Sequence, residues 1–92
     1  TDESRRTRHP VLDPAAARVL IDRGVHVLAV DTMSPDPTGG GDFPVHEVVL
    51  GSDHLIVETL CGVGSLPARV RVGFFPLKIS GDGAPVRAVT FT

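Results

Sequence analysis

A helix followed at once by a buried strand is the feature that most constrains the fold of this chain. Asp13 is a good N-cap and Pro14 suits the first helical turn, so we expect a helix over residues 14–23. Gly24 suits the left-handed position that ends a helix. The apolar run at residues 25–30 then predicts a strand covered on both faces. A helix and a strand joined by one glycine are typical of an α/β protein.

The rest of the chain supplies one more helix and three more strands. We expect a short helix over residues 44–51 and a second buried strand over residues 55–60. Residues 68–79 and 85–91 flank a Gly-Asp-Gly turn, which predicts a C-terminal β-hairpin. The expected fold is therefore α/β, with a mixed sheet, one main helix and a C-terminal hairpin.

Size and composition exclude several classes of protein. The chain has 92 residues and a net charge of -2, with four Phe and no Trp or Tyr, which argues against nucleic-acid binding. The longest stretch without a charged residue, 59–68, is far shorter than the roughly 20 residues of a membrane helix. Cys61 is alone, so a disulfide within the chain is excluded, and we expect a buried structural thiol. Residues 1–9 resemble a flexible tail or a severed linker and not a signal peptide, so we expect a cytoplasmic protein.

Two side chains suggest metal chemistry. Among the four histidines, His46 stands out because it lies in the short second helix, just beyond a glycine-rich loop. Glu58 interrupts an otherwise apolar strand, and burial of a lone carboxylate is costly. Glu58 therefore either faces solvent by alternation or pairs with a cation such as a metal ion or an arginine. Imidazole and carboxylate are both metal-ligand types.

The loop over residues 31–43 follows a buried strand, where open α/β sheets place their ligands. It contains two prolines and three consecutive glycines, so regular structure is not expected. Asp31, Ser34 and Asp36 can orient a ligand or His46 from this loop. The alternative is that they form side-chain turns that only shape the loop.

Seven motifs occur together in a fixed order from about His9 to Thr92. They are Gly24-Val25, Asp31 to Pro37, Pro44-Val45-His46, Leu50-Gly51, Ile56-Val57-Glu58, Leu66-Pro67 and Pro76 to Ala88. In this order they resemble the C-terminal part of the cyclase family, which includes bacterial kynurenine formamidases and isatin hydrolases. The resemblance implies the C-terminal half of a swivelling β/β/α-type fold, which would make residues 10–92 a portion of a hydrolase domain.

The resemblance also implies an activity. In formamidase-like members two divalent ions lie side by side, a histidine matching His46 holds one of them, and a glutamate matching Glu58 bridges both. The expected function is metal-dependent hydrolysis of a C–N bond in a small amide, either a formamide or a cyclic amide, with Zn or Mn as the metal.

The chain departs from the family in what it does not contain. The motif His-x-Gly-Thr-His-x-Asp-x-Pro-x-His, which supplies most metal ligands and the proton-transfer histidine, has no match here. No catalytic residue is therefore identified in the chain, and further metal ligands must come from outside it. The chain is then a proteolytic piece, one of two subunits, or a non-catalytic structural remnant. In the first two cases we expect a complementary N-terminal segment or subunit as partner, and a homo-oligomer of the completed unit.

Overall fold

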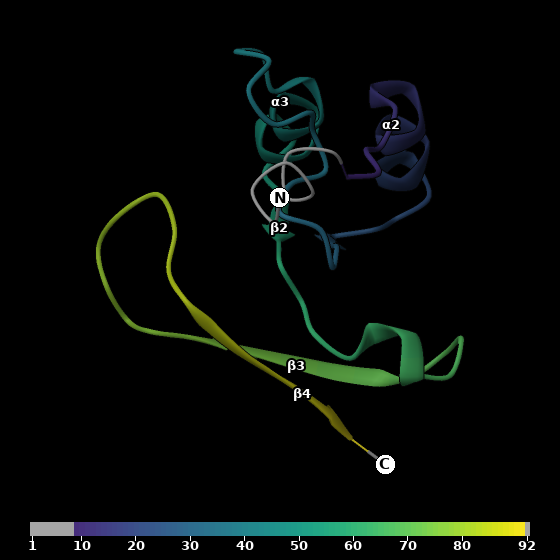
Figure 1. Cartoon of the computed structure of the whole chain (residues 1–92), viewed down its shortest axis with the longest axis vertical. Helices are drawn as coiled ribbons and strands as arrows, with labels where there is room; N and C mark the ends of the chain where they lie inside the picture. The colour runs from purple at the N-terminus through teal and green to yellow at the C-terminus, as the bar shows by residue number, and fades with distance from the viewer. Residues whose placement is uncertain (1–8, 92) are drawn as a thin grey trace. The chain divides into compact units, whose positions relative to one another are not determined.

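The computed structural model describes residues 9–91 (Figure 1). Most of the predicted tail, residues 1–8, lies outside the described residues. The chain divides into two compact units, Thr1–Cys61 and Gly62–Thr92, which are described separately below. Within the described part, neither helix is long and apolar enough to cross a membrane.

The first unit begins with the predicted helix and strand. Helix α2 spans Pro14–Asp22, and the Asp13 carboxylate accepts a hydrogen bond from the Ala15 amide at 2.8 Å. Gly24 follows the helix with a φ of 97°, in the left-handed region that glycine enters at low cost. The predicted helix is thus confirmed. Strand β1 spans only Val27–Ala29 and is therefore shorter than the strand predicted over residues 25–30.

The second helix and strand complete this unit. Helix α3 spans Pro44–Gly51, the predicted bounds, and strand β2 spans Leu55–Val57. β2 runs parallel to β1, with Val27 opposite Leu55 and Ala29 opposite Val57. The predicted strand 55–60 therefore ends early, one residue before Glu58.

The core of the first unit is formed where α2 and α3 pack together. Ala17 of α2 and Val45 and Val49 of α3 are buried. Partly buried side chains pack against them, and these are Leu12, Ile21, Leu28, Val48 and Ile56. Each fully buried valine contributes about 1.5–3 kcal/mol through the hydrophobic effect. The core therefore fixes α3, which carries His46, against the two parallel strands.

The second unit is an antiparallel hairpin preceded by a short 3-10 turn at Val63–Ser65. Strands β3, Arg71–Pro76, and β4, Val86–Phe91, pair from Arg71 opposite Phe91 to Pro76 opposite Val86, which confirms the predicted hairpin. The rings of Phe75 and Phe91 lie over Gly73, where a β-carbon would meet them at 2.9 and 3.0 Å. No described residue of this unit is buried, so its apolar side chains remain accessible on both faces of the hairpin.

Two expectations require correction. The structure is α/β, as predicted, but in place of one mixed sheet the described residues form two separate sheets of two strands each. The parallel pair belongs to the first unit and the antiparallel pair to the second. Cys61, predicted to be buried, is exposed at the end of the first unit.

Candidate metal site

The loop between β1 and α3 is held in place by its own polar side chains. The Thr32 hydroxyl donates to the Ser34 carbonyl at 2.9 Å, and the Asp36 amide donates to the Ser34 hydroxyl at 3.0 Å. The Leu12 amide donates to the Pro35 carbonyl at 2.8 Å. Residues 34–36 are buried, although they belong to no helix or strand. This part of the loop is therefore a fixed support for the site.

Asp36 caps helix α3 from a distance in the sequence. Its side chain is fully buried and accepts hydrogen bonds from the amides of Val45 at 2.8 Å and His46 at 2.9 Å. These amides lie in the first helical turn, where N–H groups have no partner within the helix. Phe43, the residue at the N-cap position, makes no side-chain cap. Asp36 takes over that role and places a negative charge at the positive end of the helix dipole.

The surroundings of Asp36 favour its ionised form. Burial by itself raises the pKa of the carboxyl group, because it disfavours charge. The hydrogen bonds from the Val45 amide and from the side chain and amide of His46 outweigh burial. The pKa of Asp36 is therefore lowered from its ordinary value of 3.8, and the group is a carboxylate at neutral pH.

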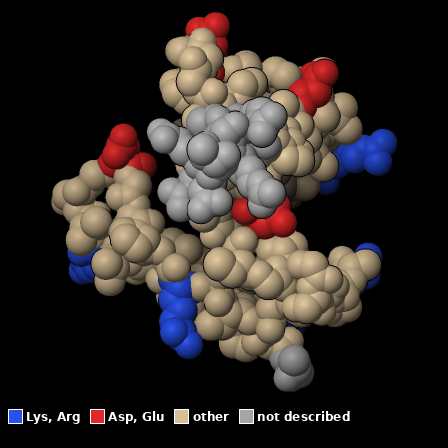
Figure 2. Space-filling model, in the orientation of Figure 1, with Lys and Arg blue, Asp and Glu red and all other residues tan. Residues whose placement is uncertain are grey.

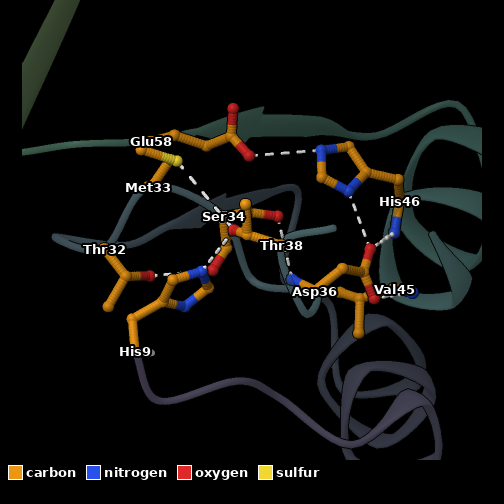
Figure 3. Close-up of polar contacts among 9 residues, drawn as sticks. All are labelled: His9, Thr32, Met33, Ser34, Asp36, Thr38, Val45, His46 and Glu58. Atoms are coloured by element: carbon orange, nitrogen blue, oxygen red, sulfur yellow. Dashed lines mark hydrogen bonds and ion pairs between the residues drawn. The ribbon is translucent and has the colours of Figure 1, made fainter. Parts of the chain in front are cut away.

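The imidazole of His46 lies between two carboxylates (Figure 3). Its Nδ1 is 2.7 Å from Oδ2 of Asp36, and its Nε2 is 3.2 Å from Oε2 of Glu58. The ring of Phe43 meets the imidazole edge-on, with centroids 5.6 Å apart. Asp36 approaches from the loop and Glu58 from the end of β2, so three separate segments meet at this histidine.

This arrangement leaves one imidazole with two acceptors. A neutral imidazole carries a single N–H, and Asp36 is the better acceptor because it is buried and ionised. The lone pair of Nε2 then faces the Glu58 carboxylate, which is unfavourable unless a proton or a metal ion lies between them. A carboxylate that fixes one ring nitrogen so that the other can bind a metal is a recurrent arrangement in metal sites. The donor set therefore fits a divalent cation at Nε2 and Glu58.

The described residues do not complete such a site. Within residues 9–91, no three His, Cys, Asp or Glu side chains are grouped so that together they could hold a metal ion. The Glu58 side chain is 35% exposed and that of His46 is 25% exposed, so both remain accessible to further ligands. A metal held here would need donors from outside these residues or from water.

The other residues singled out from the sequence lie in different surroundings. Asp31 is exposed, whereas Ser34 is buried and bonded within the loop, so its observed contacts shape the loop. His9, at the boundary of the predicted tail, lies 2.7 Å from the Thr38 hydroxyl through its Nε2. His26 stacks on a second histidine, His54, at the other end of the parallel strands, with centroids 5.5 Å apart.

Sequence reasoning placed Asp36 near the site but missed its main structural role. Nothing in the local sequence shows that this side chain caps a helix beginning eight residues later. The capping role of Asp36 could have been inferred from a missing local cap. The N-cap position of this helix holds Phe43, and not the Ser, Thr, Asp or Asn that usually caps a helix. A helix start without a local cap needs an acceptor for its free amides from elsewhere in the chain.

Charged side chains do not gather around one patch on the surface in view. On the face shown in Figure 2, and outside the grey residues, Lys and Arg side chains stand apart from one another. Within either unit, this view shows no continuous basic stripe of the kind that binds a phosphate backbone.

Comparison with known proteins relates the chain to a kynurenine formamidase. The chain is 37% identical over 79 residues to a kynurenine formamidase of Salinibacter ruber (strain DSM 13855 / M31). The match covers 85% of this chain but only 37% of the relative, so the chain spans little more than a third of that protein's length. No family model and no solved structure matches the chain. The similarity supports the relation to the cyclase family that the sequence motifs indicate.

Proposed function

We propose that this chain is part of a metal-dependent hydrolase that cleaves a C–N bond of a small amide, a formamide or a cyclic amide. His46 and Glu58 are the metal ligands that the chain contributes. The metal is Zn or Mn, since one imidazole and one carboxylate suit both ions. The similarity to a kynurenine formamidase supports the type of reaction.

One observation carries the proposal, namely the orientation of the His46 imidazole. In the tautomer that donates from Nδ1 to Asp36 at 2.7 Å, the Nε2 lone pair faces Glu58 at 3.2 Å. Nε2 is then satisfied either by a second ring proton or by a metal ion bound between it and Glu58. We assign the metal ion because the sequence motifs resemble a family of metal-dependent hydrolases.

Each residue of the chain then has a defined task. Asp36 fixes the tautomer and direction of the imidazole. His46 and Glu58 would hold the divalent ion together with ligands from outside the chain. The ion would lower the pKa of a bound water and would polarise the substrate carbonyl. Phe43, which is half exposed, makes a T-shaped ring contact with the imidazole of His46.

The proposal includes a partner that completes the site. The remaining ligands and the proton-transfer group come from polypeptide that corresponds to the unmatched part of the relative, as an N-terminal segment or a separate subunit. The hairpin supports this, because an isolated two-stranded hairpin is only marginally stable in water. Its exposed apolar side chains, Val72, Phe75, Val86 and Phe91, are surfaces that such polypeptide can cover. The completed unit is expected to form a homo-oligomer.

Metal titration tests the ligand assignment on the 92-residue chain itself. Binding of Zn²⁺ or Mn²⁺ is measured by isothermal titration calorimetry. We expect the wild-type chain to bind the metal ion about tenfold more tightly than the Glu58→Ala or His46→Ala variant does. Glu47→Ala is the matched control, because Glu47 is an exposed acid next to His46 in the sequence, whereas the carboxylates that pair with the His46 ring are those of Asp36 and Glu58. Equal losses in Glu58→Ala and Glu47→Ala would show only a general charge effect and would refute the assignment.

The second candidate function is a non-catalytic assembly role for the same fold, favoured by the uncovered hairpin. On that reading His46→Ala lowers stability and changes nothing else. The two functions separate in the metal titration, because only the hydrolase proposal requires His46→Ala to lose metal at a temperature where the variant stays folded. Circular dichroism recorded on the same samples establishes that the variant is folded.

A further inference from the structure

The pairing of the two parallel strands is interrupted directly at Glu58. The Leu55 amide donates to the His26 carbonyl at 3.1 Å, and the Val30 amide donates to the Val57 carbonyl at 2.9 Å. Continued at this spacing, the ladder would bring the Thr59 amide to the Val30 carbonyl. The amide that donates there instead is that of Leu60, at 3.2 Å. One extra residue therefore lies between the end of β2 and the next hydrogen bond to the first strand, so the regular parallel ladder stops at Val57.

The extra residue is accommodated by an unusual backbone conformation at Thr59. This residue has a φ of 59°, in the left-handed region. For a β-branched side chain such a value is a genuine outlier, because the side chain crowds the backbone there. Strained residues of this kind persist only where the surrounding structure holds them, and they cluster at functional sites.

The Thr59 amide released from the ladder is used elsewhere. It donates to the Thr32 carbonyl at 2.8 Å. The Thr32 hydroxyl in turn donates to the Ser34 carbonyl, and the Ser34 hydroxyl accepts from the Asp36 amide. Asp36 holds His46, and His46 faces Glu58, the residue before Thr59 (Figure 3). The contacts therefore form a ring: they lead from Thr59 to the loop, from the loop to His46 on α3, and from His46 to Glu58, which precedes Thr59.

We infer that Thr59 is a positioning residue for the metal-ligand pair His46–Glu58. Its left-handed conformation diverts its amide from β1 to the loop and so ties the end of β2 to the segment that carries Asp36. Glu58 is then fixed on both sides, by the strand ladder before it and by the loop after it. The inference rests on the proposed function for its purpose, but its geometry can be tested without any metal.

The test compares variants of the full 92-residue chain that accept or remove this conformation. Thr59→Gly and Thr59→Asn suit the left-handed region, so both should raise the melting temperature by several degrees and keep Zn²⁺ affinity within twofold. Thr59→Val keeps the branched shape without the hydroxyl, and it should match wild type in both measurements. Deletion of Thr59 lets Leu60 continue a regular ladder, so the chain should stay folded but lose at least tenfold in Zn²⁺ affinity.

A metal-free NMR readout keeps the inference separate from the proposed function. A nuclear Overhauser effect between the Glu58 Hγ and His46 Hε1 protons should be present in wild type and in Thr59→Gly, and absent in the deletion variant. If the deletion variant does not fold, the Gly and Asn variants decide, because a fall in melting temperature in both overturns the left-handed assignment. Retention of the Overhauser effect and of Zn²⁺ affinity after deletion would also overturn the inference. A chain that binds no Zn²⁺ but shows the expected Overhauser effects would reject the proposed function alone.

Discussion

Replacement of Asp36 is the perturbation whose consequences the structure defines most fully. The side chain is fully buried, and its two oxygens accept three hydrogen bonds, from the Val45 amide and from the amide and imidazole of His46. Asp36→Ala removes all three hydrogen bonds at once. It leaves two amides of the first turn of α3 and one imidazole N–H without a partner in a partly buried place.

The expected loss in the free energy of unfolding is the sum of two contributions. Removal of a helix cap costs about 1 kcal/mol. Removal of a charged acceptor from the His46 ring costs about 1.5–3 kcal/mol. Together they give about 2.5–4 kcal/mol, a large part of the roughly 5–15 kcal/mol that stabilises small proteins. Since 1 kcal/mol shifts the melting temperature of a domain this size by about 4–8 °C, the midpoint should fall by about 10 °C or more.

Urea unfolding followed by circular dichroism at 222 nm measures this loss. Asp42→Ala is the matched control, because Asp42 lies exposed in the same loop, and its replacement should change the free energy of unfolding by less than about 0.5 kcal/mol. A loss of less than about 1 kcal/mol in Asp36→Ala would refute the remote cap, since no other described group replaces those acceptors.

The carboxylate of Asp36 should also make the stability of the chain depend on pH. The pKa of Asp36 is lowered from 3.8 in the folded chain. The ionised group therefore contributes stability that is fully present above about pH 4 and is lost as the pH falls through the lower, folded pKa. Asp36→Asn has no such titration, so its deficit relative to wild type should be constant near neutral pH and shrink below the ordinary pKa. A deficit that stays the same in urea unfolding from pH 6 to pH 2 would contradict the assignment.

Two further predictions concern packing. Val45 has no exposed surface, so Val45→Ala should lower the free energy of unfolding in urea by about 2 kcal/mol. Val19 is 51% exposed, so Val19→Ala should lower it by less than about 0.5 kcal/mol. Equal losses in the two variants would mean that the core is wrongly assigned. Gly73→Ala places a β-carbon 2.9 Å from a phenylalanine ring of the hairpin, and the ring must move, so hydrogen exchange of the β3 and β4 amides should quicken. Gly64→Ala, which meets no atom within 4 Å, should leave that exchange unchanged.

Local elements followed from the sequence because their determinants are close neighbours in the chain. Asp13 caps a helix whose first residues follow it directly, and Gly24 ends the same helix in the left-handed region. The hairpin likewise brings together segments joined by one turn. In each case the interaction that fixes the element spans only a few residues, so the type and spacing of those residues suffice.

Strand ends could not be predicted in the same way. The apolar run through residue 60 continues past the point where β2 stops. The strand stops because Thr59 turns into the left-handed region and gives its amide to Thr32 instead of to β1. Hydrophobic pattern reports which residues are apolar, but it carries no information about which carbonyl an amide will meet.

The sequence by itself determined the elements, the caps within them, and the residue types of the candidate site, because these follow from propensity and short-range spacing. Tertiary structure alone decided that Asp36 and Glu58 would meet the two nitrogens of His46. The three residues come from a loop, a strand end and a helix, so their distances depend on how α3 packs on the strands. Packing is a sum over many weak contacts between distant segments, whereas a cap or a turn is a single local hydrogen bond.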